Sequence, residues 1–122
     1  MSGIQIKVIT QFLSDHSSSA DKQFAFAYTI AVTNNGTRPY QLISRHWIIT
    51  DGNRQVQEVR GEGVVGQTPW IAPAATFTYT SGAILETPVG TMEGSYTFKD
   101  EDDNTFDALI PRFSLIQPGT LH

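Results

Sequence analysis

The residue types with the clearest chemical meaning lie in one glycine-rich stretch, Gly61-Glu62-Gly63-Val64-Val65-Gly66, directly after Arg60. Successive backbone N–H groups in such a loop can form a nest that holds a phosphate or pyrophosphate. A neighbouring guanidinium would strengthen that binding, whereas the Glu62 carboxylate would repel an anion. The stretch therefore has two interpretations. It is a loop whose glycines take positive φ or allow a bulge, or it is a small-anion site formed by Arg60, Gly61, Gly63, Val64, Val65 and Gly66.

The same stretch matches the G-x-G-x-x-G pattern of dinucleotide-binding folds, but the residues that follow exclude that fold. The dinucleotide motif works because a helix follows the glycines and directs its N-terminus at the pyrophosphate. Here Pro69 and Pro73 follow closely, and they prevent a regular helix. We expect no Rossmann-type site.

The acidic residues and histidines show no spacing typical of catalysis. Acid–base pairs of the glycosidase or aspartic-protease type need two carboxylates held in different environments, and no spacing among the acidic residues selects such a pair. His16, His46 and His122 are far apart, and cysteine is absent, which excludes thiolate nucleophiles and zinc–thiolate sites. We expect no enzymatic activity and no catalytic residues.

A metal site also lacks support in the sequence. The run from Asp100 to Asn104 resembles the start of a calcium-binding loop, but Thr105 and Pro111 stand where an EF-hand needs glycine and glutamate. The run is better interpreted as a solvated hairpin tip. We therefore expect no metal ligands and no cofactor, and binding of Mg²⁺ or Co²⁺ has no ligand spacing behind it.

Two large side chains have alternative interpretations. Arg45 shares strand parity with Ile43 and Trp47, which predicts that it turns toward the core and forms an ion pair or contacts an anion. Trp70 lies between two prolines in the segment 63–85, which contains no charged residue. With Ile71, Trp70 is predicted either to cover one end of the fold or to form an exposed anchor for a partner protein.

The elements that must position these residues are β-strands. Apolar and polar residues alternate with period two along much of the chain, and turn residues separate the runs. The expected strands span residues 4–12, 24–32, 40–51, 54–60, 75–81, 94–99 and 105–110, with Phe113 and Leu115 pairing at an edge. Seven or eight short strands predict an all-β, two-sheet antiparallel sandwich, and a small Greek-key barrel is the main alternative.

Two local features favour an immunoglobulin-like or fibronectin type III-like sandwich. Trp47 lies in the third expected strand, where such folds bury a tryptophan between the sheets. The spacing of Gly94, Tyr96 and Phe98 is that of a tyrosine corner, in which the tyrosine hydroxyl bonds to the backbone a few residues upstream.

Composition narrows the class of protein. The chain has 122 residues, which fits a single domain 1–122 with its core at about 4–116. Its net charge is −4, which argues against nucleic acid as a partner. Prolines, glycines and polar residues inside 63–85 argue against a membrane span. Because cysteine and a signal peptide are lacking, we expect a cytoplasmic protein, and its edge strands allow a monomer or a homodimer.

Several stretches taken together resemble the ApaG domain family. They are residues 44–51 (SRHWIITD), 57–66 (QEVRGEGVVG), 79–82 (YTSG) and 87–96 (TPVGTMEGSY), and the similarity runs in order from about Ile4 to Ile116. The sequence departs from the family at Trp70 and at Ala74-Ala75, where relatives vary and often place glycine after the proline. This resemblance implies a fibronectin type III-like β-sandwich.

The resemblance also carries expectations about function. Family members are bacterial cytoplasmic proteins, often encoded beside a diadenosine tetraphosphate hydrolase and an rRNA adenine dimethyltransferase, and are associated with cobalt resistance and magnesium efflux. Eukaryotic relatives carry the domain within an F-box protein and a polymerase-delta-interacting protein, which implies an unidentified protein partner. The stretch Gly61–Gly66 corresponds to the family's proposed pyrophosphate-binding element, which implies pyrophosphate or a nucleotide polyphosphate as an alternative ligand.

Overall fold

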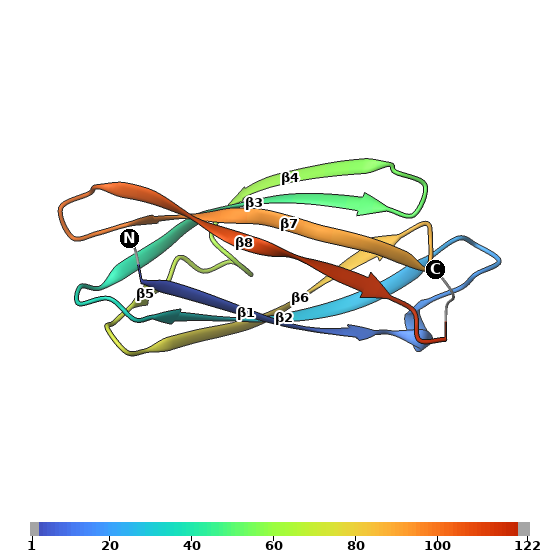
Figure 1. Ribbon diagram of the computed structural model, residues 1–122, viewed down its shortest axis with the longest axis horizontal. Helices are drawn as coiled ribbons and strands as arrows, with labels where there is room; N and C mark the ends of the chain where they lie inside the picture. Colours follow the sequence, from blue (N-terminus) through green and yellow to red (C-terminus); the bar gives the residue numbers. More distant parts are fainter. Residues whose placement is uncertain (1–2, 120–122) are drawn as a thin grey trace.

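The computed structural model describes residues 3–119, which form two antiparallel β-sheets packed face to face (Figure 1). The prediction of an all-β, two-sheet sandwich is confirmed, while its immunoglobulin-like subtype stays a prediction. The strands and one short 3-10 turn are β1 (Ile4–Phe12), η1 (Ser14–His16), β2 (Phe24–Asn34), β3 (Tyr40–Asp51), β4 (Val56–Glu62), β5 (Trp70–Ile71), β6 (Thr76–Leu85), β7 (Val89–Lys99) and β8 (Thr105–Ile116).

The order of the strands leaves one side of the sandwich open. The smaller sheet has the order β1-β2-β6, and the larger sheet has the order β4-β3-β7-β8, with β5 pairing β3 beyond the end of β4. β1 packs beside β8 on one side. On the other side, β4 and β6 are both edge strands, and the chain between them passes from the larger to the smaller sheet (Figure 1).

The inner faces of both sheets form one hydrophobic core. In β2 the large residues alternate inward as expected from Phe24 to Val32, because side chains of a strand point alternately to its two faces. Trp47 is 2 % exposed and meets Tyr28 edge-on, with ring centroids 5.5 Å apart. The prediction of a tryptophan buried between the sheets is confirmed.

The tyrosine corner is not formed. The hydroxyl of Tyr96 forms a hydrogen bond with the hydroxyl of Tyr79 on the opposite sheet. Within the described residues, it does not form the hydrogen bond to a nearby backbone group that the sequence spacing predicts. Both rings are buried, and this burial raises the pKa of Tyr79 and Tyr96 above the ordinary tyrosine value. A protonated hydroxyl pair thus links the two sheets.

Two β-bulges adjust which residues face the core. Ile43 has no partner in β7, so Leu42 is fully buried and the inward parity resumes at Arg45 and Trp47.

In β8 the residues Pro111 and Arg112 fall between the pairs made by Ile110 and Phe113. Proline is tolerated there because a bulge on an edge strand needs no ladder hydrogen bond. The strand therefore continues beyond Pro111, and pairing of Phe113 and Leu115 at an edge is confirmed.

A buried asparagine links the end of β2 to the segment that carries Trp70. The Asn34 amide nitrogen donates to the carbonyls of Arg38 at 2.7 Å and Ile71 at 2.9 Å, and its oxygen accepts from the N–H of Gly36 at 2.9 Å. Asn34 is fully buried, and all of these partners are backbone groups. The side chain thus holds two connecting segments against each other.

Within residues 3–119, no helix has the length and apolar character needed to cross a membrane.

Candidate functional site

The glycine-rich loop is a tight turn rather than an extended nest. Val64 and Gln67 exchange two backbone hydrogen bonds of 2.8 and 2.9 Å, and the residues between them, Val65 and Gly66, have φ of 43° and 79°. Two successive positive φ values are typical of a type I′ turn. The interpretation that glycines here serve positive φ is confirmed at Gly63 and Gly66, and the buried Val64 side chain anchors the loop.

The turn leaves few donors for an anion. The N–H of Gly63 donates to the carbonyl of the bulged Ile43 at 2.8 Å, and that of Val64 donates to Gln67. Across the described residues, the N–H groups of Val65 and Gly66 donate to no protein acceptor. Of the loop N–H groups that the sequence predicts as donors to an anion, those of Val65 and Gly66 remain available for binding.

Arg60 does not face this loop. It pairs with His46 across β4 and β3, so its side chain lies on the outer face of the larger sheet. Its guanidinium donates to Glu58 at 3.1 Å, and His46 bonds the same carboxylate at 2.5 Å. The hydrogen bond from His46, with Arg60 nearby, lowers the pKa of Glu58 below its usual value. Arg60 as a loop cation is therefore a wrong prediction, because alternate residues of a strand point to opposite faces.

Arg45 is the cation that lies beside the loop. It pairs with Gly61, and a Cβ atom on Gly61 would lie 2.7 Å from the guanidinium carbon. Gly61 thus provides room for the Arg45 side chain. The Nη1 atom of Arg45 donates to the carbonyls of Glu62 at 3.0 Å and Gly63 at 2.8 Å.

The inward direction of Arg45 agrees with its strand parity, but the ion pair considered from the sequence is absent. Within residues 3–119, no carboxylate oxygen lies within 4.0 Å of its guanidinium. The half-buried charge is instead held by backbone carbonyls. This arrangement leaves the Nε and Nη2 sides of the guanidinium without a protein acceptor among the described residues.

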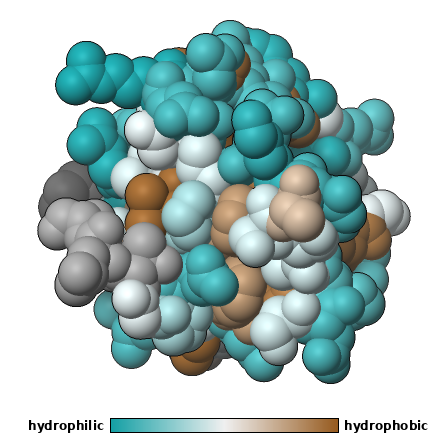
Figure 2. Space-filling model, turned by 90° about the vertical axis from the view of Figure 1, so that its right-hand side faces the viewer, coloured by the Kyte–Doolittle hydropathy of each residue, from teal (hydrophilic) through white to brown (hydrophobic). Residues whose placement is uncertain are grey.

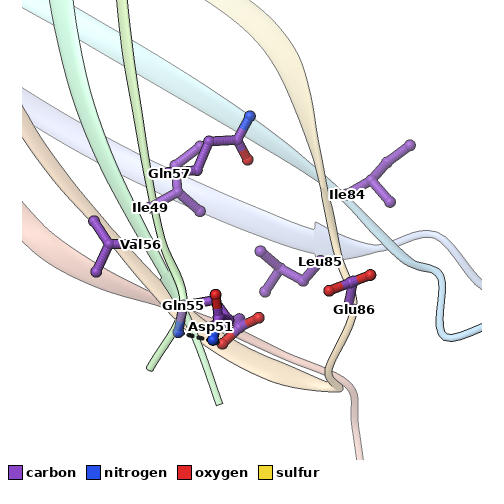
Figure 3. A pocket seen from close by; sticks show the side chains of 8 residues that line it. All are labelled: Ile49, Asp51, Gln55, Val56, Gln57, Ile84, Leu85 and Glu86. Carbon is purple, nitrogen blue, oxygen red and sulfur yellow. Dashed lines mark hydrogen bonds between the residues drawn. The ribbon is translucent and has the colours of Figure 1, made fainter. Parts of the chain in front are cut away.

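Arg45 lies in an inter-sheet groove that follows the open side between β4 and β6. Three adjoining cavities of about 190, 350 and 260 Å³ make up this groove. The first two share Ile49, Gln57 and Ile84. The second and third share Tyr28, Arg45, Trp47 and Ser81. Figure 3 shows the end of the groove, where Ile49 and Gln57 of the larger sheet lie across from Leu85 of the smaller sheet, while Ile84 points away from them.

Trp70 lies on another surface. Its pairing with Gln41 places it on the outer face of the larger sheet, where it is 49 % exposed and the Lys99 ammonium lies 6.0 Å from its ring centroid. The prediction that it covers one end of the sandwich is therefore wrong. Ile71 is 2 % exposed and belongs to the core, so its side chain cannot contribute to a partner surface.

The acidic run forms the predicted hairpin tip. Asp100 accepts backbone hydrogen bonds from Asp102 at 2.8 Å and Asn104 at 3.0 Å, closing the turn between β7 and β8. Arg38 pairs with Asp100 and Asp102 at 3.4 and 2.9 Å. Over residues 3–119, no three metal-ligating side chains form a group that could hold an ion.

Comparison with known proteins settles the family. Residues 14–100 match the family model described as ApaG domain. Protein ApaG of Pseudomonas fluorescens is 55 % identical over 119 residues, covering 98 % of this chain and 94 % of that protein. The chain belongs to the ApaG domain family. Protein ApaG of Aromatoleum aromaticum, at 52 % identity with the same coverage, gives the same result.

Solved structures are also similar to this chain. The crystal structure of the putative ApaA protein from Bordetella pertussis is 48 % identical and has a TM-score of 0.93, covering 98 % of this chain and 97 % of that one. A protein from Archaeoglobus fulgidus, at 13 % identity and a TM-score of 0.53, is similar in fold alone. The family resemblance seen in the sequence is thereby confirmed for nearly the whole chain.

Proposed function

We propose that this ApaG domain is a non-catalytic interaction module whose contact surface includes Trp70 and the uncharged segment 63–85. The observation that carries the proposal is the position of Trp70, which is half exposed and yet held by strand pairing to β3. Strand pairing fixes the backbone at this position, an aromatic side chain has few rotatable bonds to order on binding, and tryptophan is enriched at binding hot spots. The neighbouring Lys99 provides a polar rim.

A non-catalytic role is supported by how the ionisable groups are used. Glu58 is hydrogen-bonded to His46 and Arg60 on the outer face of a sheet, and these three residues line none of the cavities described above. Asp100 serves to close a turn. These contacts give Glu58, His46, Arg60 and Asp100 structural roles, and no two of these four residues line one of the cavities described above as an acid and a base.

Site-specific photo-crosslinking in living bacteria tests the Trp70 surface. We expect p-benzoylphenylalanine at position 70 to give a discrete crosslinked product with a partner protein. Position 9 is the matched control, because Ile9 is also apolar and 73 % exposed but lies on the outer face of the smaller sheet. Trp70→Ala should abolish capture of the same partner while leaving the melting temperature within about 2 °C, since a half-exposed side chain contributes little to stability. Equal crosslinking at both positions, or unchanged capture by Trp70→Ala, would exclude this surface.

A second candidate function is binding of pyrophosphate or a nucleotide polyphosphate beside the glycine loop. It is favoured by the two available N–H groups of Val65 and Gly66, which line the same cavity as Arg45. In this version Arg45 replaces Arg60 as the cation. The exposed Glu62 lines the cavity too and would repel the ligand unless a divalent ion such as Mg²⁺ accompanies it.

An NMR titration with inorganic pyrophosphate, with and without Mg²⁺, tests this candidate. Saturable shifts at Val65 and Gly66 that are lost in Arg45→Gln and kept in Arg60→Gln are the expected result. Arg60 serves as the control because its guanidinium faces the opposite side of the sheet. Absence of saturable shifts, or equal loss in both variants, would exclude the glycine loop as an anion site.

A further inference from the structure

We propose that the inter-sheet groove binds an extended segment of a partner protein, which pairs with the edge of β6 and places an acidic side chain against Arg45. This inference rests on the proposed interaction function and assigns to it a second surface, which is formed by the β6 part of the segment 63–85 and does not include Trp70. The groove lies between the sheets, whereas Trp70 lies on the outer face of the larger sheet.

The β6 edge is suited to receive another strand. β6 pairs with β2 along its whole length, and its other edge pairs with no strand of the described chain. Its residues carry no charge, while the facing edge strand β4 carries Glu58, Arg60 and Glu62. Extended peptides bind such edges by main-chain hydrogen bonds, and pockets beside the edge select their side chains.

Arg45 supplies the charge that selects the ligand. Its guanidinium is half-buried, has no carboxylate partner within residues 3–119, and keeps its Nε and Nη2 sides without a protein acceptor there. A carboxylate can bind the planar guanidinium through two parallel hydrogen bonds. An aspartate or glutamate on the incoming segment would therefore satisfy a charge that the protein leaves unpaired.

The other residues that line the groove determine which further side chains the incoming segment can carry. Ile49, Val59 and Ala83 provide apolar contacts for side chains on the same face of the incoming strand. Arg45 lines the second and third cavities, Glu62 lies in the third, and Asp51 and Glu86 lie in the first, at the other end. The carboxylate of Asp51 already accepts the N–H groups of Asn53 and Gln55. The groove thus favours an acidic residue in the middle of an aliphatic strand and disfavours acidic residues at its ends.

Apolar surface is exposed at the end of the sandwich nearest the cavity that Asp51 and Glu86 line. Figure 2 faces this end and shows hydrophobic surface among hydrophilic residues. Exposed apolar residues beside this cavity include Val56 at 64 % and Ile84 at 62 %. Because Ile84 belongs to β6, a strand paired with the β6 edge would lie beside its side chain and cover part of it, which adds a hydrophobic contribution to binding.

Selection from a phage-displayed library of random nine-residue peptides against the full-length protein tests the inference. We expect enriched peptides to share one aspartate or glutamate flanked by alternating β-branched residues. A synthetic peptide of the enriched sequence should bind Arg45→Gln about tenfold or more weakly than the unaltered protein, because a charge-assisted bidentate contact is lost. Replacing its acidic residue by the corresponding amide should have the same effect.

A second pair of variants keeps the test independent of any folding defect in Arg45→Gln. Ser81→Glu puts a carboxylate on β6 inside the groove, where Ser81 lines two of the cavities together with Arg45. Thr78→Glu adds the same charge to the same strand on its exposed outer face. We expect Ser81→Glu to abolish peptide binding and Thr78→Glu to leave it within about twofold.

The outcomes distinguish binding in the inter-sheet groove from binding at the Trp70 surface. Failure to enrich peptides, enrichment without an acidic residue, or binding unaffected by Ser81→Glu overturns the groove as a peptide site. Peptides that lose binding in Trp70→Ala but not in Ser81→Glu overturn the groove and support the Trp70 surface. Loss in Ser81→Glu with a negative crosslink at position 70 supports the groove and contradicts the Trp70 surface. Pyrophosphate binding at Arg45 without any enriched peptide overturns the inference and leaves the anion candidate.

Discussion

Gly94→Ala is expected to lower the free energy of unfolding by about 3 kcal/mol or more. Gly94 pairs with Trp47 in the centre of the larger sheet, and a Cβ atom at this position would lie 1.9 Å from the carbonyl oxygen of His46. The clashing atom belongs to the backbone of β3, which cannot move without breaking its pairing with β7. The substitution thus separates the two central strands that carry Trp47 and Tyr96.

Urea denaturation followed by Trp47 fluorescence in a Trp70→Phe background measures this effect. Gly66→Asn is the matched control, because Gly66 has φ of 79° but an added Cβ would meet no atom within 4 Å. Asparagine tolerates positive φ, so this variant should stay within about 0.5 kcal/mol of its parent. Similar stabilities for the two variants would contradict the close approach of Gly94 to β3.

Asn34→Ala is expected to lower the free energy of unfolding by about 3 kcal/mol. The substitution removes hydrogen bonds to the backbone of Gly36, Arg38 and Ile71 at a fully buried position. The backbone groups that bond to Asn34 would stay buried without a hydrogen-bond partner, which costs more free energy than the loss of an exposed hydrogen bond. Because Ile71 adjoins Trp70, the variant should also increase the solvent exposure of the Trp70 ring.

Thermal denaturation and quenching of Trp70 fluorescence by acrylamide in a Trp47→Phe background check both parts. Asn35→Ala is the control, since Asn35 is exposed and its side chain makes one hydrogen bond of 3.4 Å, to Gln5. We expect this control to change stability by less than about 0.5 kcal/mol. An Asn34→Ala protein as stable as Asn35→Ala would show that the buried amide does not hold the two segments together.

Much of the fold follows from local periodicity. The alternation in residues 24–32 predicts β2 and its inward face, because one buried sheet face imposes period two on the sequence. The ends of the strands follow less closely from local periodicity. β6 continues through Ser81 and Gly82 to Leu85 because β2 offers it pairing partners over that whole length. β8 passes Pro111 because a bulge removes the need for a ladder hydrogen bond.

The candidate site depends on contacts that local pattern cannot supply. Strand parity predicts that Arg45 points inward and by itself predicts that Arg60 points outward, whereas the proximity of Arg60 to the glycines in the sequence favours Arg60 as the anion ligand. The groove itself forms where β4 and β6, distant in sequence, lie as edges on the same side. Tyr28 and Ser81 could not be assigned to it without the packing of the two sheets. Similarly, the hydroxyl of Tyr96 meets Tyr79 across the core rather than a local backbone group.

The uncharged edge of β6 has a consequence for the behaviour of the protein at high concentration. Its sequence from Thr76 to Leu85 is rich in β-forming residues and contains neither charge nor proline. Segments of this kind assemble into intermolecular cross-β aggregates when they are left uncovered. The β8 edge is interrupted by Pro111, and β4 carries alternating charges, but β6 has neither protection. Aggregation of this domain should therefore begin at β6, and any ligand that covers this strand should slow it.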